Sequence, residues 1–375
     1  MLHTPLAREL GIEHPIFAFT YQPEVAAAVS RNGGLGVLGA VRFSPGELAE
    51  ALDYMDRETG GRPYGVDVVM PASSEEVDAD QVPEILAQLE RMIPQEHRDF
   101  IERVLDEHKV GPLPEGEQVP RGLLGWTDAT ARPQVEIALS HNIALLANAL
   151  GPPPRDIVDQ AHDCDVPVAA LVGRVDQALK QRDQGVDIVV AQGTEAGGHS
   201  GEIATMVLVP EVVEALAPSP VLAAGGIGRG TQVAAALALG AQGVWTGSVW
   251  LTTAEHELQE ALRSKLLAAS SRDTVRSRSL TGKPARQLRT AWTDAWEDPA
   301  NPDPLGMPLQ YLLTSEAQHR IRVSGKEELL GIPVGQIIGS VTATRPVAEV
   351  MQSLVHDAVT TIKALQTLTT SEVAS

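Results

Sequence analysis

The residue best placed to do chemistry is His199, which lies in a glycine-rich stretch. Four glycines, at positions 193, 197, 198 and 201, surround it, and Ser200 follows it directly. Glycines let a loop lie flat against a planar ligand, and the imidazole would then project toward that ligand. An imidazole can act as base or acid near neutral pH. Because Ser200 lacks the GxSxG spacing of a hydrolase elbow, we expect acid–base chemistry at His199.

Two further glycine-rich segments favour the binding of a phosphate. Ala224–Gly230 contains glycines 225, 226, 228 and 230, and Thr246–Ser248 contains Gly247. The free N–H groups of a helix expected to begin near Thr231, with Gly247 and Ser248 beside them, would attract a dianionic phosphate. The alternative is that these glycines only permit tight turns and close helix–sheet packing. We expect phosphate binding because both segments carry the pattern.

These segments follow short apolar runs, which occur eight times. The runs are 15–19, 35–40, 64–70, 143–150, 166–173, 186–193, 221–227 and 243–249. They show little alternation, as expected for strands buried on both faces of a parallel sheet, and helical patterns lie between most of them. This order predicts an α/β fold, the (β/α)8 TIM barrel, whose active site lies at the carboxyl ends of the strands. The segments that begin at Asp67 and Gln192 follow the third and sixth expected strands, so both residues belong to the same expected site as His199.

The remaining sequence predicts additions to the barrel. We expect residues 1–251 to form the barrel, interrupted by a helical insertion at about 71–128 after the third strand, because that segment is too long for a simple connection. Residues 252–375 are expected to form a helical cap packed on the barrel. The charges follow this division, since 75–117 carries a net charge of −9 and 271–290 a net charge of +5.

Composition excludes several classes of partner. The net charge of −20 argues against wrapping nucleic acid and against binding an anionic membrane surface. Cys164 is the only cysteine, and no stretch approaches 18 consecutive apolar residues. We therefore expect a cytoplasmic enzyme that acts on a small molecule, with homo-oligomers left open.

Two other motifs carry little weight. Gly34-x-Gly36-x-x-Gly39 matches a dinucleotide fingerprint literally, but it lies before and within an expected strand instead of opening a helix. His162–Asp165 contains metal-ligand types, yet it closes a helix at the amino end of a strand. The other histidines show no metal-binding spacing. We expect no metal site.

Three segments together resemble a known family. Residues 191–201 (AQGTEAGGHSG), 220–227 (PVLAAGGI) and 234–241 (AAALALGA) closely resemble nitronate monooxygenases, formerly called 2-nitropropane dioxygenases. Residues 32–36 and 281–286 are also similar to family segments. FMN-dependent enoyl-[acyl-carrier-protein] reductases are related and carry a similar EAGGH loop. The resemblance implies a barrel that binds FMN without covalent attachment and a smaller helical domain.

The resemblance also implies roles for individual residues. His199 matches the catalytic histidine near the reactive part of the flavin. The implied cofactor-binding residues are Asp67, Gln192, Gly197, Gly198, Gly225, Gly226, Gly247 and Ser248. Asp67 stands where many members have Asn, and an ionised Asp accepts hydrogen bonds but cannot donate them. The Pro-Met pair typical after the first strand is replaced by Phe17–Thr20.

The expected function is FMN-dependent oxidation of small alkyl nitronates, or of nitroalkanes, with dioxygen to a carbonyl compound and nitrite. His199 would deprotonate a nitroalkane or, as imidazolium, pair with nitronate oxygens. The basic segment at 272–289 would either attract the anionic substrate or pair with the acidic insertion. Alternatives are an FMN-dependent NAD(P)H enoyl-thioester reductase, a flavin-binding protein without turnover, and a phosphosugar or nucleotide enzyme on the same barrel.

Overall fold

Eight parallel strands close into a barrel in the computed structural model, which describes residues 2–70, 82–117, 119 and 128–368. The strands are β1 Ile16–Thr20, β2 Leu35–Gly39, β3 Tyr64–Asp67, β4 Leu145–Asn148, β5 Val168–Val172, β6 Ile188–Gln192, β8 Val221–Ala224 and β9 Gly243–Thr246. Seven of them lie within the predicted apolar runs and β1 extends one residue beyond its run, so the prediction of a (β/α)8 barrel is confirmed. Successive side chains of a strand point to opposite faces, which produces two packed layers.

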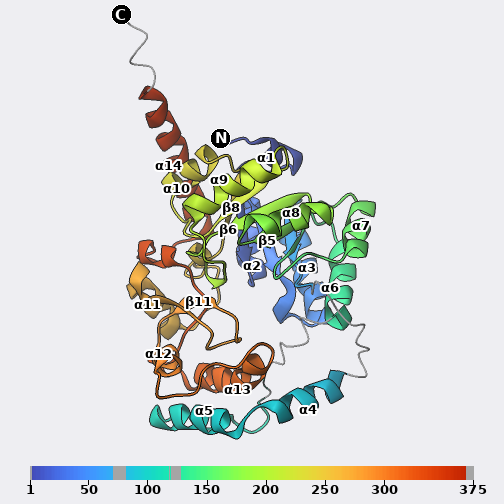
Figure 1. Cartoon of the computed structure of the whole chain (residues 1–375). Helices are drawn as coiled ribbons and strands as arrows, with labels where there is room; N and C mark the ends of the chain where they lie inside the picture. Colours follow the sequence, from blue (N-terminus) through green and yellow to red (C-terminus); the bar gives the residue numbers. More distant parts are fainter. Residues whose placement is uncertain (1, 71–81, 118, 120–127, 369–375) are drawn as a thin grey trace, which may run out of the picture.

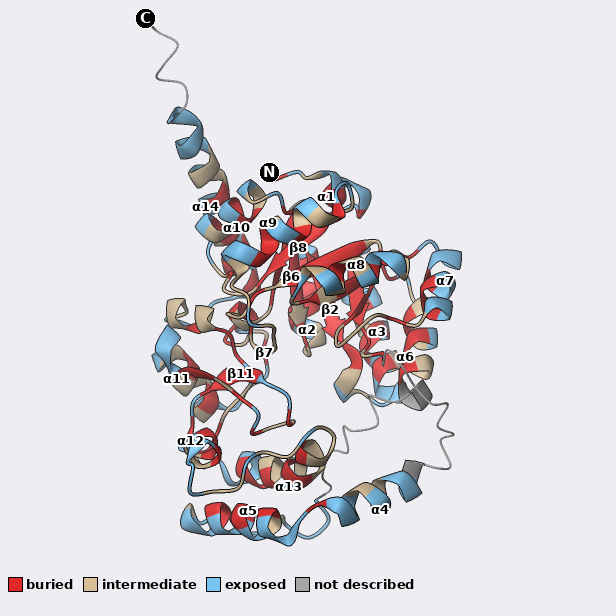
Figure 2. Ribbon diagram, in the orientation of Figure 1, coloured by how far each residue is buried: buried red, intermediate tan, exposed pale blue. Residues whose placement is uncertain are grey.

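The inner layer fills the barrel lumen and the outer layer joins strands to helices. Phe17, Val37, Leu145, Val190 and Trp245 belong to the lumen cluster, which the short helix α1 Pro5–Glu9 closes at the amino ends of the strands. The outer helices are α2 Pro23–Arg31, α3 Pro45–Glu58, α6 Asp128–Ser140, α7 Arg155–Asp163, α8 Val175–Asp183, α9 Thr205–Leu216 and α10 Gly230–Ala238. The barrel strands are buried almost throughout (Figure 2).

The last helix of the chain returns to the barrel. α14 Val347–Thr367 packs against α10 and α2, and Val350, Met351 and Leu354 join the outer-layer cluster. It thereby covers the position that follows β9, where a (β/α)8 barrel needs its eighth helix. The division of the chain at residue 251 stays a prediction, and α14 associates with the barrel side of it.

The insertion and the C-terminal segment share a second core. The insertion forms α4 Val82–Met92 and α5 Gln95–Glu107, and the C-terminal segment forms α11 Glu260–Ala268, α12 Ala291–Glu297 and α13 Leu309–Ser324. Phe100 of α5 packs edge-on against Trp296 of α12, with ring centroids 4.7 Å apart. Figure 1 shows α4, α5 and α13 side by side, on the side of the molecule away from α1. Both predicted additions therefore contain helices, and these pack together. Residues 71–81, 118 and 120–127 of the predicted insertion lie outside the described residues, and the bounds of both additions stay predictions.

A small antiparallel sheet connects these helices to the barrel. It consists of β10 Thr274–Ser277, β11 Ala285–Leu288 and β7 Gly198–His199, in the order β10-β11-β7. The basic segment therefore forms strands, and one of them pairs with the strand that carries His199. Within the described residues, no helix has both the length and the apolar character required to cross a bilayer.

Candidate active site

The carboxyl end of the barrel lumen carries two of the expected polar side chains. Val190 and Ile188 face the lumen, so Gln192 on the same strand face does so as well. Asp67 pairs in register with Gly39 on one side and with Ala147, a lumen residue, on the other. The structure therefore places Asp67 and Gln192 at the same barrel mouth.

Asp67 lies in an apolar and aromatic environment. Its exposed fraction is 3%, and burial raises the pKa of the carboxyl to about 7. The rings of Tyr21 and Phe19 pack against Gly39, the residue that pairs with Asp67 in the sheet. A Cβ on Gly39 would lie only 2.8 Å from Tyr21 and 2.9 Å from Phe19. Near neutral pH, roughly half of the Asp67 side chains hold a proton and can donate a hydrogen bond. The acceptor-only role described for an ionised Asp therefore applies only to the ionised part of the population.

His199 is held by the C-terminal segment instead of by the barrel. It pairs with Ala285 of β11, and its Nε2 lies 2.8 Å from Oγ1 of Thr281 in a hydrogen bond. Burial and, to a smaller extent, the nearby charge of Lys283 together lower the pKa of the imidazole to about 4. His199 is therefore neutral at physiological pH, which argues against the imidazolium expected as one alternative.

The loop that carries His199 is fixed at three further points. The carboxylate of Glu195 accepts hydrogen bonds from the backbone N–H and the hydroxyl of Thr205, at 3.1 and 2.8 Å. The Nε of Arg286 donates to the carbonyl of Thr194 at 2.9 Å, and the N–H of Gln336 donates to the carbonyl of Glu195 at 2.9 Å. These contacts attach the loop to both α9 and the C-terminal segment.

The two glycines before His199 have different reasons to be glycine. A Cβ on Gly197 would lie 2.7 Å from the backbone nitrogen of Gly335 and 2.8 Å from Val334, so close packing within the protein explains Gly197. Gly198 has a φ of +77°, and a Cβ there would meet no atom within 4 Å. Open space therefore lies beside Gly198, where a planar ligand could approach the backbone. Gly197 has no such space on that side.

The expected phosphate donors are partly used by the protein itself. The N–H groups of Gly228 and Arg229 both donate to Oε1 of Gln232, at 3.0 Å each. A Cβ on Gly230 would lie 2.5 Å from α14, so packing explains this glycine. These two N–H groups, which precede α10, are therefore capped by a side chain of that helix and are not available to a phosphate. Phosphate binding near the start of α10 stays a prediction.

Other donors of the same loops remain open. Among the residues that the structure describes, the N–H groups of Gly226, Gly247 and Ser248 donate to no protein acceptor. Gly225 and Gly226 adopt positive φ values of 97° and 68°, and the nearest atom to a Cβ on Gly247 would be 4.0 Å away. The Oγ of Ser248 accepts from the N–H of Gly335 at 2.8 Å, so its hydrogen is still available to a ligand. This arrangement can hold an anion with backbone groups.

The basic segment does not pair with the acidic insertion in the described part of the chain. Arg276 pairs with Glu202 at 3.3 Å, and Arg289 pairs with Asp294 at 2.8 Å. The insertion pairs instead with α13, through Glu102 and Arg320 at 2.7 Å. Lys283 of this segment forms no ion pair among the described residues, and its charge acts on His199, so this side chain can influence an anionic ligand.

Sequence reasoning missed several residues that position this site. These residues are Thr281, Glu195, Arg286 and Gln232. The first three lie in segments similar to the family (191–201 and 281–286), but that similarity gave them no role, and Gln232 acts locally on the loop before its own helix. Of the two weak motifs, Gly36 lies in β2 against α2, and His162 pairs with Asp187 at 2.8 Å. Among described residues, three potential metal ligands gather at Asp53, Asp56 and His141, which are surface groups outside this site.

Comparisons with known proteins agree with this architecture. The sequence model of the nitronate monooxygenase family matches residues 4–357. A candidate monooxygenase of Mycobacterium tuberculosis is 49% identical, over 98% of this chain and 99% of its own. A candidate nitronate monooxygenase of Staphylococcus aureus is 28% identical, over 94% of this chain and 96% of its own.

Solved structures with the same fold cover nearly the whole chain. FabK from Thermotoga maritima superposes with a TM-score of 0.73 at 25% identity, over 98% of this chain and 100% of its own. A nitroalkane oxidase from Streptomyces ansochromogenes superposes with a TM-score of 0.78 at 24% identity, over 96% and 99%. At this identity the second likeness concerns the fold alone.

Proposed function

The chain belongs to the nitronate monooxygenase family and is an oxidoreductase, and we propose that it uses FMN to oxidise small alkyl nitronates with dioxygen, giving a carbonyl compound and nitrite. The observation that carries this proposal is the neutral His199 beside the open face of Gly198, at the mouth of a barrel whose loops present unpaired N–H groups. We further propose a cytoplasmic location.

The residues at the barrel mouth fit FMN. The N–H groups of Gly226, Gly247 and Ser248 would hold its phosphate, because they have no acceptor within the described protein and the phosphate oxygens would accept their hydrogen bonds. Gly198 would let the ring lie against the loop backbone, while Gln192 and protonated Asp67 would donate hydrogen bonds to its polar edge. When bound, FMN supplies the capacity to take electrons from the substrate and pass them to dioxygen.

The pKa of His199 favours a nitronate over a neutral nitroalkane as substrate. A base is effective when its pKa lies near the working pH, and a pKa of about 4 leaves His199 too weak to remove a carbon-bound proton efficiently. A neutral imidazole can instead donate a ring N–H to an oxygen of a substrate that is already an anion. Lys283, whose charge acts on His199, would also stabilise such an anion.

The test separates this proposal from its alternatives. The protein is purified, its cofactor is extracted, and the flavin absorbance is followed under anaerobic conditions after mixing with propyl-2-nitronate, 2-nitropropane or NADPH. We expect rapid bleaching by the nitronate, slow bleaching by the nitroalkane and none by NADPH. Bleaching by NADPH alone would support an enoyl-thioester reductase, bleaching by none a flavin-binding protein without turnover, and a colourless protein a phosphosugar or nucleotide enzyme.

A further inference from the structure

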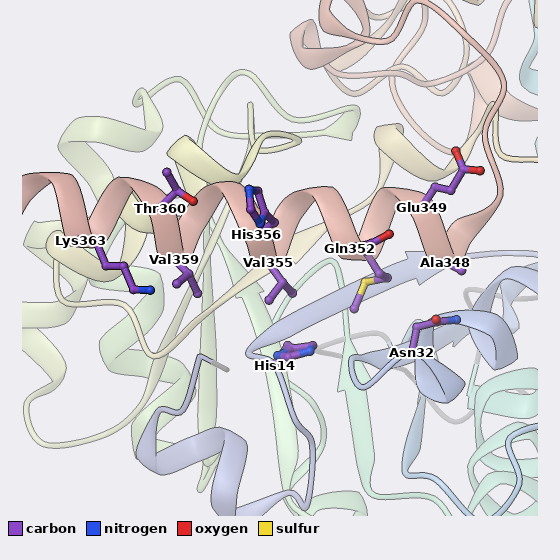
Figure 3. A pocket seen from close by; sticks show the side chains of 11 residues that line it. His14, Asn32, Ala348, Glu349, Gln352, Val355, His356, Val359, Thr360 and Lys363 are labelled. Atoms are coloured by element: carbon purple, nitrogen blue, oxygen red, sulfur yellow. The ribbon is translucent and has the colours of Figure 1, made fainter.

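A groove runs along α14 at the end of the barrel away from His199. Its volume is about 640 Å3, and its walls are α14 on one side and His14 and Asn32 on the other (Figure 3). His14 and Asn32 come shortly before β1 and β2, so the groove lies at the amino ends of the strands. The residues that serve the proposed function lie at the carboxyl ends. This groove is therefore a separate surface.

The helix that forms the groove extends past the barrel. Its first half is anchored through buried residues such as Leu354 and Ala358, and Figure 1 shows its second half projecting from the body of the molecule. On that projecting half Leu365 is 49% exposed and Leu368 is 73% exposed. Both leucines continue the face that α14 buries against the barrel, because they follow Leu354 by 11 and 14 residues, and they are therefore not part of the groove.

The groove-lining face of α14 has charges at its two ends. Residues Glu349, Gln352, His356, Val359 and Lys363 all line the groove, and their spacings of three and four place them on one stripe of the helix. Glu349 and Lys363 are equally far in sequence from His356, about 10 Å along the axis on either side. Within the described residues, neither of these two side chains forms an ion pair.

This pattern is self-complementary under a two-fold rotation. If a second α14 runs antiparallel across the first, with the axis at His356, Glu349 of each copy meets the partner's Lys363. Val355 and Val359 then lie on the groove side of this contact, whereas Leu365, nine residues from His356, faces the opposite side of the helix and takes no part in it. A parallel arrangement would instead place Glu349 against Glu349 and Lys363 against Lys363, which repel.

We propose that the groove along α14 is a self-association surface, and that its occupant is α14 of a second copy of this chain in an antiparallel, two-fold arrangement centred on His356. Symmetric dimers of this isologous type are the commonest assemblies of soluble proteins. The inference goes beyond the proposed oxidation, because none of these residues lies at the barrel mouth.

Charge reversal tests the proposal on the full-length chain. Sedimentation equilibrium should show a wild-type dimer, and Lys363→Glu or Glu349→Lys should each raise the dissociation constant at least about tenfold. The double variant Glu349→Lys/Lys363→Glu should restore wild-type association, because the pairs are recreated with opposite signs. Lys180→Glu, on exposed α8, is the matched control and should have no effect. A monomeric wild type, or a double variant no tighter than the single ones, would overturn the proposal.

A cross-link tests the arrangement independently. His356→Cys, in a Cys164→Ser background, should form an intermolecular disulfide under mild oxidation, because the two-fold axis brings the two copies of this position together. Gln366→Cys in the same background should not cross-link, since its position lies far from the axis. A dimer that survives every charge reversal and does not cross-link at 356 uses another surface, and the proposal is then wrong.

Discussion

Lowering the pH from 7 to 5 should leave His199 almost entirely neutral. Burial, with a further contribution from Lys283, lowers the pKa of this imidazole from 6.5 to about 4. At pH 5 about 9% of the His199 side chains would be protonated, compared with about 97% of histidines with an ordinary pKa. The difference is large enough to measure directly.

The same shift lowers the stability of the fold in acid. Between pH 6.5 and pH 4 the unfolded chain binds a proton that the folded chain does not, so stability falls as the pH falls. From pH 7 to pH 5 this amounts to about 2 kcal/mol. Asp67 acts in the opposite direction, because its pKa is raised from 3.8 to about 7 and the folded chain keeps a proton that the unfolded chain loses. Over the same interval Asp67 adds about 2 kcal/mol of stability, which largely hides the effect of His199.

The assay therefore compares variants. Histidine ring resonances are followed by 1H–15N NMR between pH 7 and pH 4, and His199→Gln identifies the signal that belongs to His199. Urea unfolding at pH 7 and pH 5 gives the stability of both proteins. From pH 7 to pH 5 these two groups should leave the free energy of unfolding of the wild type almost unchanged. That of His199→Gln, which keeps only the Asp67 effect, should rise by about 2 kcal/mol. A His199 signal that titrates above pH 6, or equal pH dependence in the two proteins, would refute the reasoning.

Three further predictions follow from the site. Thr281→Val should lower kcat/KM about fivefold, because a hydrogen bond of about 1 kcal/mol to His199 is lost, and steady-state kinetics should show that Thr281→Ser retains activity. Gly197→Ala should lower the apoprotein melting temperature through its clash with Gly335 and Val334. Gly198→Ala should lower it through backbone strain at a φ of +77° and should in addition weaken FMN binding, measured by fluorescence titration, which Gly197→Ala should affect less. Asp67→Asn should raise the melting temperature more at pH 8 than at pH 5, since the charged carboxylate is removed from a buried position; an equal change at both pH values would contradict the pKa assignment.

The eight strands were predictable because their signal is local. A run of apolar residues without alternation is favourable only where both faces of a strand are buried, and the order of such runs between helical patterns leaves few arrangements. The same local order identified Asp67, Gln192 and the glycine-rich loops as ends of strands, and therefore as members of one site. The resemblance of residues 191–201 then added the family.

Only the tertiary structure decided which contacts these residues make. His199 meets Thr281, 82 residues away, and Phe100 packs on Trp296, because folding brings together segments whose spacing carries no period. Glycine itself is ambiguous in a sequence: Gly197 makes room for Val334, whereas Gly198 adopts a positive φ and leaves open space, and both differences arise only when the rest of the chain has folded around them. The sequence alone therefore determined the barrel and the position of its site. The protonation of Asp67 and His199 depended on burial, which exists only once the chain has folded.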